Sequence, residues 1–174
     1  MKPMRCVYKK DDVELKEYIP TLFSPLHPRF EPMRLVRRIR FLGEYIRKEK
    51  YLVYYLYISG EPVGYCVVTP GGRRLKCSTS SDVVIGPYYV DPAKRGKRYG
   101  ELLIALTLAH CRYPYQYAYD WIEKENIPSI RASERCGFEK IGELNVVGIS
   151  RKLVEVEIGD DYIFRVSRQN VKNV

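Results

Sequence analysis

The chain has 174 residues, of which 45% are hydrophobic and 29% charged, and this composition fits one domain with a sizeable core. Ordinary glycine and proline usage and the lack of a fixed repeat exclude collagen, solenoids and low-complexity arrays. The 30 Lys and Arg residues exceed the 21 Asp and Glu residues and give a net charge of +9. This charge favours anionic partners such as phosphates, nucleic acid or an acidic protein.

The five cysteines are scattered, contain no CxxC pair and are accompanied by only two histidines. This pattern predicts reduced thiols, and neither a disulfide framework nor a metal site. No apolar run resembles a signal sequence or is long enough to span a membrane. We therefore expect a soluble, cytoplasmic protein that does not associate with membranes.

The first fifty residues predict one strand and two helices. Residues 4–8 fit a short strand, and Asp11 or Asp12 can cap a helix that ends at the breaker Pro20. From 33 to 50, apolar residues recur at spacings of three and four, with arginines and lysines at the positions between them. This spacing predicts an amphipathic helix with a basic outer face.

Strands are predicted next. Aromatic and β-branched residues at 51–59 and 63–69 predict an antiparallel hairpin. The four tyrosines of its first strand, Tyr51, Tyr54, Tyr55 and Tyr57, invite a comparison with nucleic-acid stacking surfaces, but alternation predicts that half are core residues and half partly exposed. The strand at 82–90 contains Gly86-Pro87, which a central ladder cannot accommodate without a bulge or a break. We expect the strand to splay from its neighbour there.

The rest of the chain alternates helices and strands. Helices are expected at 101–112 and 126–137, and strands at 115–122, 138–149, 152–158 and 161–167. The order predicts a mixed α and β domain around one sheet.

The turn at 91–100, VDPAKRGKRYG with its preceding valine, enters the first of these helices. Consecutive N–H groups at a helix start can cradle an anion, and four cationic side chains add to the attraction. A pyrophosphate is a natural ligand for such a turn. The spacing is neither that of a Walker A loop nor GxGxxG, so nucleotide hydrolysis and dinucleotide binding are disfavoured.

The turn and the segment after it resemble the two signatures of the GCN5-related N-acetyltransferase (GNAT) superfamily. The first is Q/R-x-x-G-x-G/A, in which Arg95 and Gly100 match the ends and Arg98 replaces the middle glycine. The second is an Asn, a short helix and a Gly-Phe pair, matched by Asn126, Ser129, Gly137 and Phe138. The resemblance implies a central mixed, mostly antiparallel sheet, splayed between the fourth and fifth strands and flanked by helices.

The resemblance also implies acetyl-CoA as co-substrate. Its pantetheine arm would lie in the splay, and its pyrophosphate would take amides between Gly96 and Gly100, with charge from Arg95 and Lys97. A side chain at Arg98 is disfavoured if the turn needs a positive φ there. The residues expected to bind the cofactor are Tyr88, Tyr89, Val90, Arg95, Gly96, Lys97, Arg98, Tyr99, Gly100, Asn126 and Ser129.

Catalysis in this family uses a base for the amine and often a tyrosine acid for the thiolate. Ser133 stands at that tyrosine's usual place, so Ser129, Ser133 or water would substitute, or the thiolate would leave unaided. Asp120 is the first candidate for the base, followed by Asp82, Tyr88 and Tyr119. A backbone N–H near Tyr89 or Val90 would polarise the acyl carbonyl.

These features predict a single-domain N-acetyltransferase, spanning 1–174, that transfers acetyl from acetyl-CoA to a primary amine by direct attack in a ternary complex, without a metal. The acceptor is a small-molecule or peptide amine, and the Arg-rich 33–50 face favours an anionic one. Two alternatives stay open: a basic nucleic-acid-binding module without catalysis, which is disfavoured, and a CoA-binding GNAT-fold protein without turnover. Acceptor identity, acyl length and homodimer formation are open.

Overall fold

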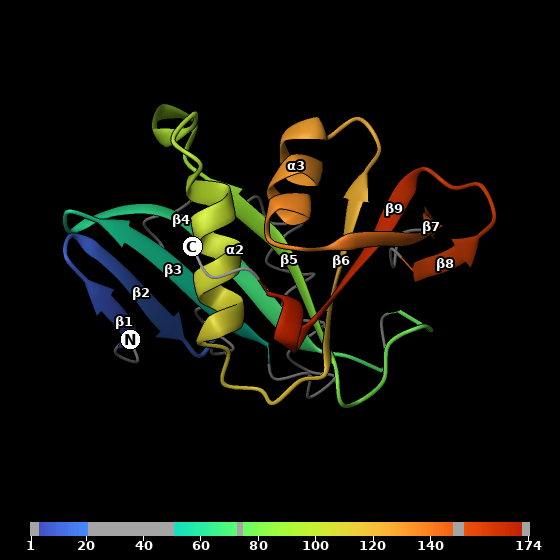
Figure 1. The fold of residues 1–174 in the computed structure, drawn as a ribbon, viewed down its shortest axis with the longest axis horizontal. Coiled ribbons are helices and arrows are strands. Elements are labelled where there is room, and N and C mark those ends of the chain that lie inside the picture. Colours follow the sequence, from blue (N-terminus) through green and yellow to red (C-terminus); the bar gives the residue numbers. More distant parts are fainter. Residues whose placement is uncertain (1–3, 21–50, 73–74, 148–151, 172–174) are drawn as a thin grey trace.

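The computed structural model describes residues 4–20, 51–72, 75–147 and 152–171, which form a nine-stranded sheet and two α-helices (Figure 1). The strands lie in the order β1-β2-β3-β4-β5-β6-β9-β7-β8, and every neighbouring pair is antiparallel except β5 with β6. The expected mixed, mostly antiparallel α+β sheet is therefore confirmed. The strands are β1 (Arg5–Lys10), β2 (Val13–Tyr18), β3 (Leu52–Ile58), β4 (Glu61–Pro70), β5 (Val83–Val90), β6 (Tyr117–Glu123), β7 (Glu139–Val147), β8 (Lys152–Val156) and β9 (Asp161–Ser167).

β1 and β2 form a hairpin, so the helix predicted to begin at Asp11 or Asp12 and to end at Pro20 is wrong. Asp11 takes a φ of +50° in the turn, a conformation that Asp tolerates better than most residues. Beyond it, Val13 and Leu15 alternate with charged residues, which is the period of a strand. Leu15 is fully buried and pairs with Leu56 of β3. The strand predicted at 4–8 is confirmed within β1.

The β3–β4 hairpin confirms the strands predicted at 51–59 and 63–69, whereas the helix predicted at 33–50 lies outside the described residues. The expectation that half of the four tyrosines at 51–59 are partly exposed is wrong. Both faces of β3 are buried: one contributes to the main core with α2, and the other to a separate aromatic cluster. All four tyrosines are 5% exposed or less, namely Tyr51, Tyr54, Tyr55 and Tyr57.

β5 and β6 are the parallel strands that splay, as predicted for the fourth and fifth strands of the expected fold. They pair only at Val83 with Ala118 and Val84 with Tyr119 within the described residues. Gly86 then takes a φ of +105°, and Pro87 has no N–H to donate to a ladder. The two strands consequently leave a common base and diverge toward the end of the molecule where α3 begins (Figure 1).

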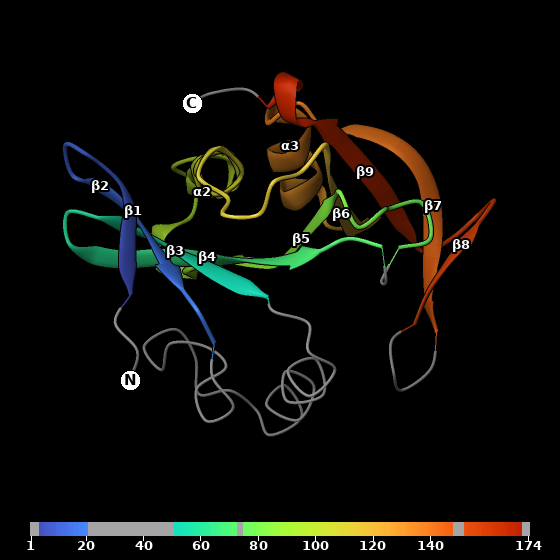
Figure 2. The ribbon, with the colours of Figure 1, turned by 90° about the horizontal axis from the view of Figure 1, so that it is seen from below.

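The helices α2 (Tyr99–Ala109) and α3 (Ile127–Arg135) lie on one face of the sheet (Figure 2). They confirm the helices predicted after the charged turn and after Asn126, and β6 to β9 confirm the later strands. Two short 3-10 turns, η1 (Pro92–Lys94) and η2 (Arg168–Asn170), complete the described elements. The face under α2 holds the main core, including Leu103 and Ile104. α3 borders the opening between β5 and β6, and α2 packs beside α3.

Candidate active site

The opening between β5 and β6 contains a hollow of about 230 Å³, here called the wedge hollow. Its walls come from the diverging halves of the two strands and from the start of α3. The lining residues include Gly86, Pro87 and Tyr88 from β5, Asp120 and Glu123 from β6, and Asn126 and Ser129 from α3. The missing β-pairing therefore leaves real space between the strands.

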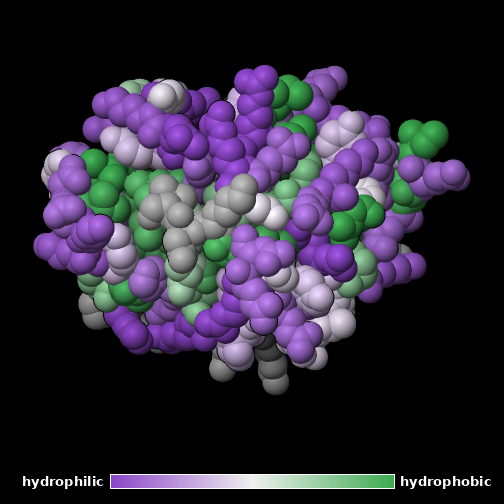
Figure 3. All heavy atoms as spheres, viewed as in Figure 1, coloured by the Kyte–Doolittle hydropathy of each residue, from purple (hydrophilic) through white to green (hydrophobic). Residues whose placement is uncertain are grey.

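A second hollow of about 480 Å³, here called the loop hollow, lies between the charged turn, α2 and α3. Tyr88, Asn126 and Ser129 line both hollows, so the two adjoin at these side chains. Hydrophilic residues gather over the turn and over α3 on the same face (Figure 3). A ligand with an anionic end and an uncharged arm can therefore place one part in each hollow.

The charged turn has the backbone that an anion cradle requires. Gly96 has a φ of +83°, and Arg98 takes the left-handed conformation with a φ of +58° at the N-cap of α2. The family's turn is therefore formed although Arg98 replaces its middle glycine. Arg98 gives α2 no side-chain cap, and the first N–H groups of a helix lack intrahelical acceptors. Tyr99 and Gly100, which begin α2, line the loop hollow.

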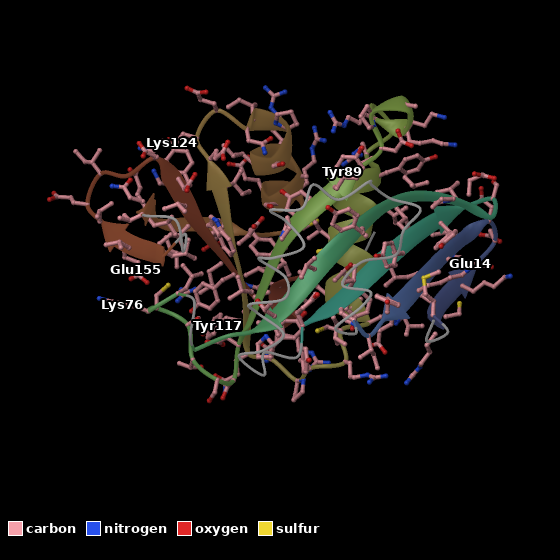
Figure 4. The ribbon with its side chains drawn as sticks, turned by 180° about the vertical axis from the view of Figure 1, so that it is seen from behind. Glu14, Lys76, Tyr89, Tyr117, Lys124 and Glu155 are labelled. Carbon is pink, nitrogen blue, oxygen red and sulfur yellow. The ribbon has the colours of Figure 1, made fainter. Side chains whose placement is uncertain are left out.

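The cationic residues of the turn have different placements. Arg95 donates from Nε to the Val90 carbonyl oxygen at 3.1 Å, and its guanidinium lies 6.0 Å from the Tyr89 ring centroid. Arg95 thereby ties the turn to the end of β5, where Figure 4 labels Tyr89. Arg95 and Arg98 line the loop hollow, whereas Lys97 is exposed and is not among its lining residues.

Asn126 caps α3, and Tyr88 joins the start of this helix to β5. The Asn126 Oδ1 atom accepts from the Ser129 N–H at 3.4 Å as the N-cap of α3. The Tyr88 hydroxyl donates to the Ser129 carbonyl oxygen at 3.2 Å, across the junction of the two hollows. Capping engages only the amide oxygen, so the Asn126 NH2 group stays available to a ligand. The family's second signature thus brings Asn126 and Ser129 to the place where the hollows meet.

Asp120 is a buried carboxyl that lines the wedge hollow, with 2% exposure. The Ser133 hydroxyl donates to its Oδ2 atom at 3.0 Å. Burial raises the pKa of Asp120 to about 7, although hydrogen bonds from Ser133 and from the Trp121 backbone act in the opposite direction. A carboxyl with this pKa can exchange a proton near neutral pH.

Ser133 is fully buried and is absent from the linings of both described hollows. The position usual for the family's acid therefore contacts Asp120 here. The other base candidates are divided: Tyr88 lines both hollows, but Asp82 and Tyr119 line neither. Asp82 accepts the N–H groups of Thr79 and Tyr117 in a turn, and the Tyr119 hydroxyl donates to the Cys77 carbonyl oxygen.

Five charged lining residues were missed from the sequence. Glu123 and Asp161 line the wedge hollow, and Glu101, Arg131 and Arg135 line the loop hollow. The two arginines are four positions apart in the helix after Asn126, a spacing that places both on one helix face. That spacing was the available signal. Asp161 carried none, because it joins the site only through the pairing of β9 with β6.

Within residues 4–20, 51–72, 75–147 and 152–171, no three His, Cys, Asp or Glu side chains are grouped so that they could hold a metal ion. No helix in these ranges has the length and apolar content needed to cross a lipid bilayer.

A sheet that opens between two parallel strands, beside a positive-φ turn at a helix start, defines the class of GNAT acyltransferases. The sequence profile of the Acetyltransferase (GNAT) family matches residues 16–138. The chain belongs to this family, and it is an acyltransferase of the GNAT type. A comparison with curated proteins finds no match.

Solved structures share the fold at low sequence identity. RimL, a ribosomal L7/L12 alpha-N-protein acetyltransferase, has a TM-score of 0.64 at 12% identity over 94% of each chain. Spermidine N-acetyltransferase from Vibrio cholerae, in complex with CoA and spermine, has a TM-score of 0.57 at 15% identity, over 80% of this chain and 79% of that one. The putative acetyltransferase yncA from Salmonella typhimurium, with acetyl-CoA, has a TM-score of 0.52 at 23% identity, over 76% of this chain and 72% of that one. At these identities the likeness establishes the fold alone.

Proposed function

We propose that this protein, as one acyltransferase domain, transfers the acetyl group of acetyl-CoA to a primary amine that attacks directly within a ternary complex. The observation that carries this proposal is that the two hollows adjoin. One is bordered by a basic turn at a helix start, and the other ends at a buried carboxyl with a pKa of about 7. The pyrophosphate of acetyl-CoA needs the first environment, and the amine that attacks the thioester needs a base such as the second provides.

The cofactor assignment follows the groove. The pyrophosphate binds N–H groups between Gly96 and Gly100 at the positive end of α2, with Arg95 and Arg98 beside it. The pantetheine arm pairs with the backbone of Tyr88, Tyr89 and Val90, which β6 leaves unpaired, and with Asn126. Lys97 contributes long-range charge only. Because the loop hollow and the unpaired strand edge fit these parts, acetyl-CoA fits the residues present.

We assign proton removal from the acceptor and hydrogen bonding to the leaving thiolate to Asp120 and Ser129, which both line the wedge hollow. Asp120 removes a proton from the acceptor ammonium, directly or through water, and Ser133 positions its carboxylate. The neutral amine then attacks the acyl carbon, a C–N bond forms, and the C–S bond breaks to release the CoA thiolate. A backbone N–H near Tyr89 or Val90 stabilises the developing oxyanion. The Ser129 hydroxyl donates a hydrogen bond to the departing CoA thiolate. Because a thiolate is only modestly basic, its departure depends little on this hydrogen bond.

Gly100→Glu tests the cofactor site. We expect it to weaken acetyl-CoA binding by at least about tenfold, or about 1.4 kcal/mol, because a carboxylate would face the pyrophosphate. A Cβ at Gly100 would lie 3.9 Å from both the Val90 Cγ2 and Ala132 Cβ atoms, so a side chain can begin there without a clash. Gly100→Gln is the uncharged control of equal size. Calorimetric titration with acetyl-CoA compares the two variants. Equal dissociation constants would mean that the pyrophosphate binds elsewhere.

Ser133→Ala tests the positioning role. Removing its hydrogen bond takes away an effect that lowers the pKa of Asp120, so the acid limb of the pH–rate profile should move to higher pH. Ser133→Thr, which keeps the hydroxyl, should restore the limb if the pocket accepts the methyl group. A uniform loss of rate at every pH, with the limb unmoved, contradicts the role.

The acceptor is proposed as a small-molecule or peptide amine. The Arg-rich segment that favours an anionic amine lies outside the described residues, whereas Glu123 and Asp161 add negative charge to the wedge hollow. A thiol-release assay with spermidine, amino-sugar nucleotides and acidic peptides separates these cases. Preference for spermidine over every anionic amine would overturn the anionic acceptor.

A further inference from the structure

The loop hollow carries more positive charge than a pyrophosphate needs. Four guanidinium groups line it: Arg95 and Arg98 from the turn, and Arg131 and Arg135 from α3. One carboxylate, Glu101, also lines it and lowers the net charge to +3. A pyrophosphate linkage carries about two negative charges and already has the helix start and the two turn arginines. The pyrophosphate therefore does not need the two α3 arginines.

Ion pairs fix part of this cluster in place. Arg98 donates to both carboxylate oxygens of Glu101, at 2.8 and 2.9 Å, and Arg135 Nη1 lies 3.8 Å from Glu101 Oε2. Glu101 is 8% exposed, so its carboxylate is held at the base of the cluster. Arg131 makes no ion pair with any residue in the described ranges, and it is exposed. One α3 arginine is thus oriented toward α2 and the other is free to take a ligand.

We propose that Arg131 and Arg135 bind the 3′-phosphate of CoA and make the enzyme select CoA over 3′-dephospho-CoA. This inference rests on the proposed use of acetyl-CoA. A phosphomonoester carries about −1.5 to −2 charges at pH 7 and matches the guanidinium fork of arginine. Arg131 and Arg135 are one helical turn apart on α3 and line the same hollow as the pyrophosphate cradle. A phosphate there bridges α3 to the turn before α2.

The test is a double-mutant cycle in which one mutation is made in the ligand. Calorimetry measures the dissociation constants of CoA and 3′-dephospho-CoA for the wild type, Arg131→Gln, Arg135→Gln and the double variant. Arg165→Gln removes an equal charge on β9, where Arg165 is exposed and lies over the Tyr117 ring, and serves as control. Thermal unfolding of each variant verifies the fold.

We expect the wild type to prefer CoA by at least about tenfold, and the double variant to lose most of this preference. Affinity for 3′-dephospho-CoA should change by less than about threefold, because that ligand lacks the group that the arginines contact. An equal loss for both ligands, or a wild type without preference, overturns the assignment. Absence of any CoA binding by the wild type would instead contradict the proposed function itself.

Discussion

Asp120→Asn is expected to lower kcat by at least about 100-fold while the dissociation constant of acetyl-CoA changes by less than about threefold. The amide keeps the size of the side chain and can still accept from the Ser133 hydroxyl, but it cannot take a proton. Burial raises the pKa of the Asp120 carboxyl to about 7, so wild-type turnover should fall as the pH drops below 7. The variant's residual rate should lack this limb. Steady-state thiol release measured from pH 5 to 9 provides the comparison.

Glu134→Gln on α3 is the control for this loss, because Glu134 is exposed, lines neither hollow and lies next to Ser133 in the chain. If Asp120→Asn keeps the wild-type kcat, Asp120 is not the base. CoA binding by the wild type without thiol release for any amine in a broad panel would favour the alternative of a CoA-binding protein without turnover.

Asp120→Asn should also make the protein more stable than the wild type in alkaline buffer. The pKa of Asp120 is about 7 in the folded protein and 3.8 for an ordinary aspartate, so between these values the folded state binds more protons. Stability of the wild type therefore falls as the pH rises through this range, by up to about 1.4 kcal/mol per pH unit. The amide of the Asp120→Asn variant stays neutral and has no such titration. The gain in stability of this variant over the wild type should therefore grow from pH 5 to pH 8 in urea unfolding.

The sequence was sufficient to predict features that depend on local backbone chemistry. Gly86 and Pro87 cannot continue a parallel ladder, and the splay begins at this pair. The turn before α2 needs a positive φ, and Arg98 accepts it. β2 was mispredicted as a helix because a six-residue segment can fit the period of a helix as well as that of a strand. The pairing of β2 with β3 selects the strand, and β3 lies about forty residues further along the chain.

The pairing inside the site depends on tertiary contacts that spacing does not determine. Asp120 lies on β6 and Ser133 on α3, and only their packing shows that the serine serves the carboxylate. Similarly, Glu101 and Arg135 meet because α2 and α3 lie together on one face of the sheet (Figure 2). Sequence reasoning supplied the candidates Asp120 and Ser133 separately, but not this relation between them.

Gly64→Ala should lower the free energy of unfolding by about 2–3 kcal/mol, since overpacking against backbone has few ways to relax. Gly64 lies on β4 opposite Val90, and a Cβ there would be 2.3 Å from the Tyr89 carbonyl oxygen. The end of β5 cannot retreat freely, because the Tyr89 ring stacks on Tyr65 at 5.7 Å. Gly142→Ala on β7 is the matched control: its Cβ would meet the Ile163 Cδ1 atom at an ordinary 3.7 Å.

The control should change the free energy of unfolding by less than about 0.5 kcal/mol in the same urea titration. Gly64→Ala should also weaken acetyl-CoA binding, because the atoms that the new methyl group displaces belong to the Tyr89–Val90 edge assigned to the pantetheine arm. Equal stability of the two variants would show that β5 can move away from β4 at this point. A destabilised Gly64→Ala protein with unchanged affinity for acetyl-CoA would separate the edge from the cofactor, and the pantetheine would then have to bind β6 or α3.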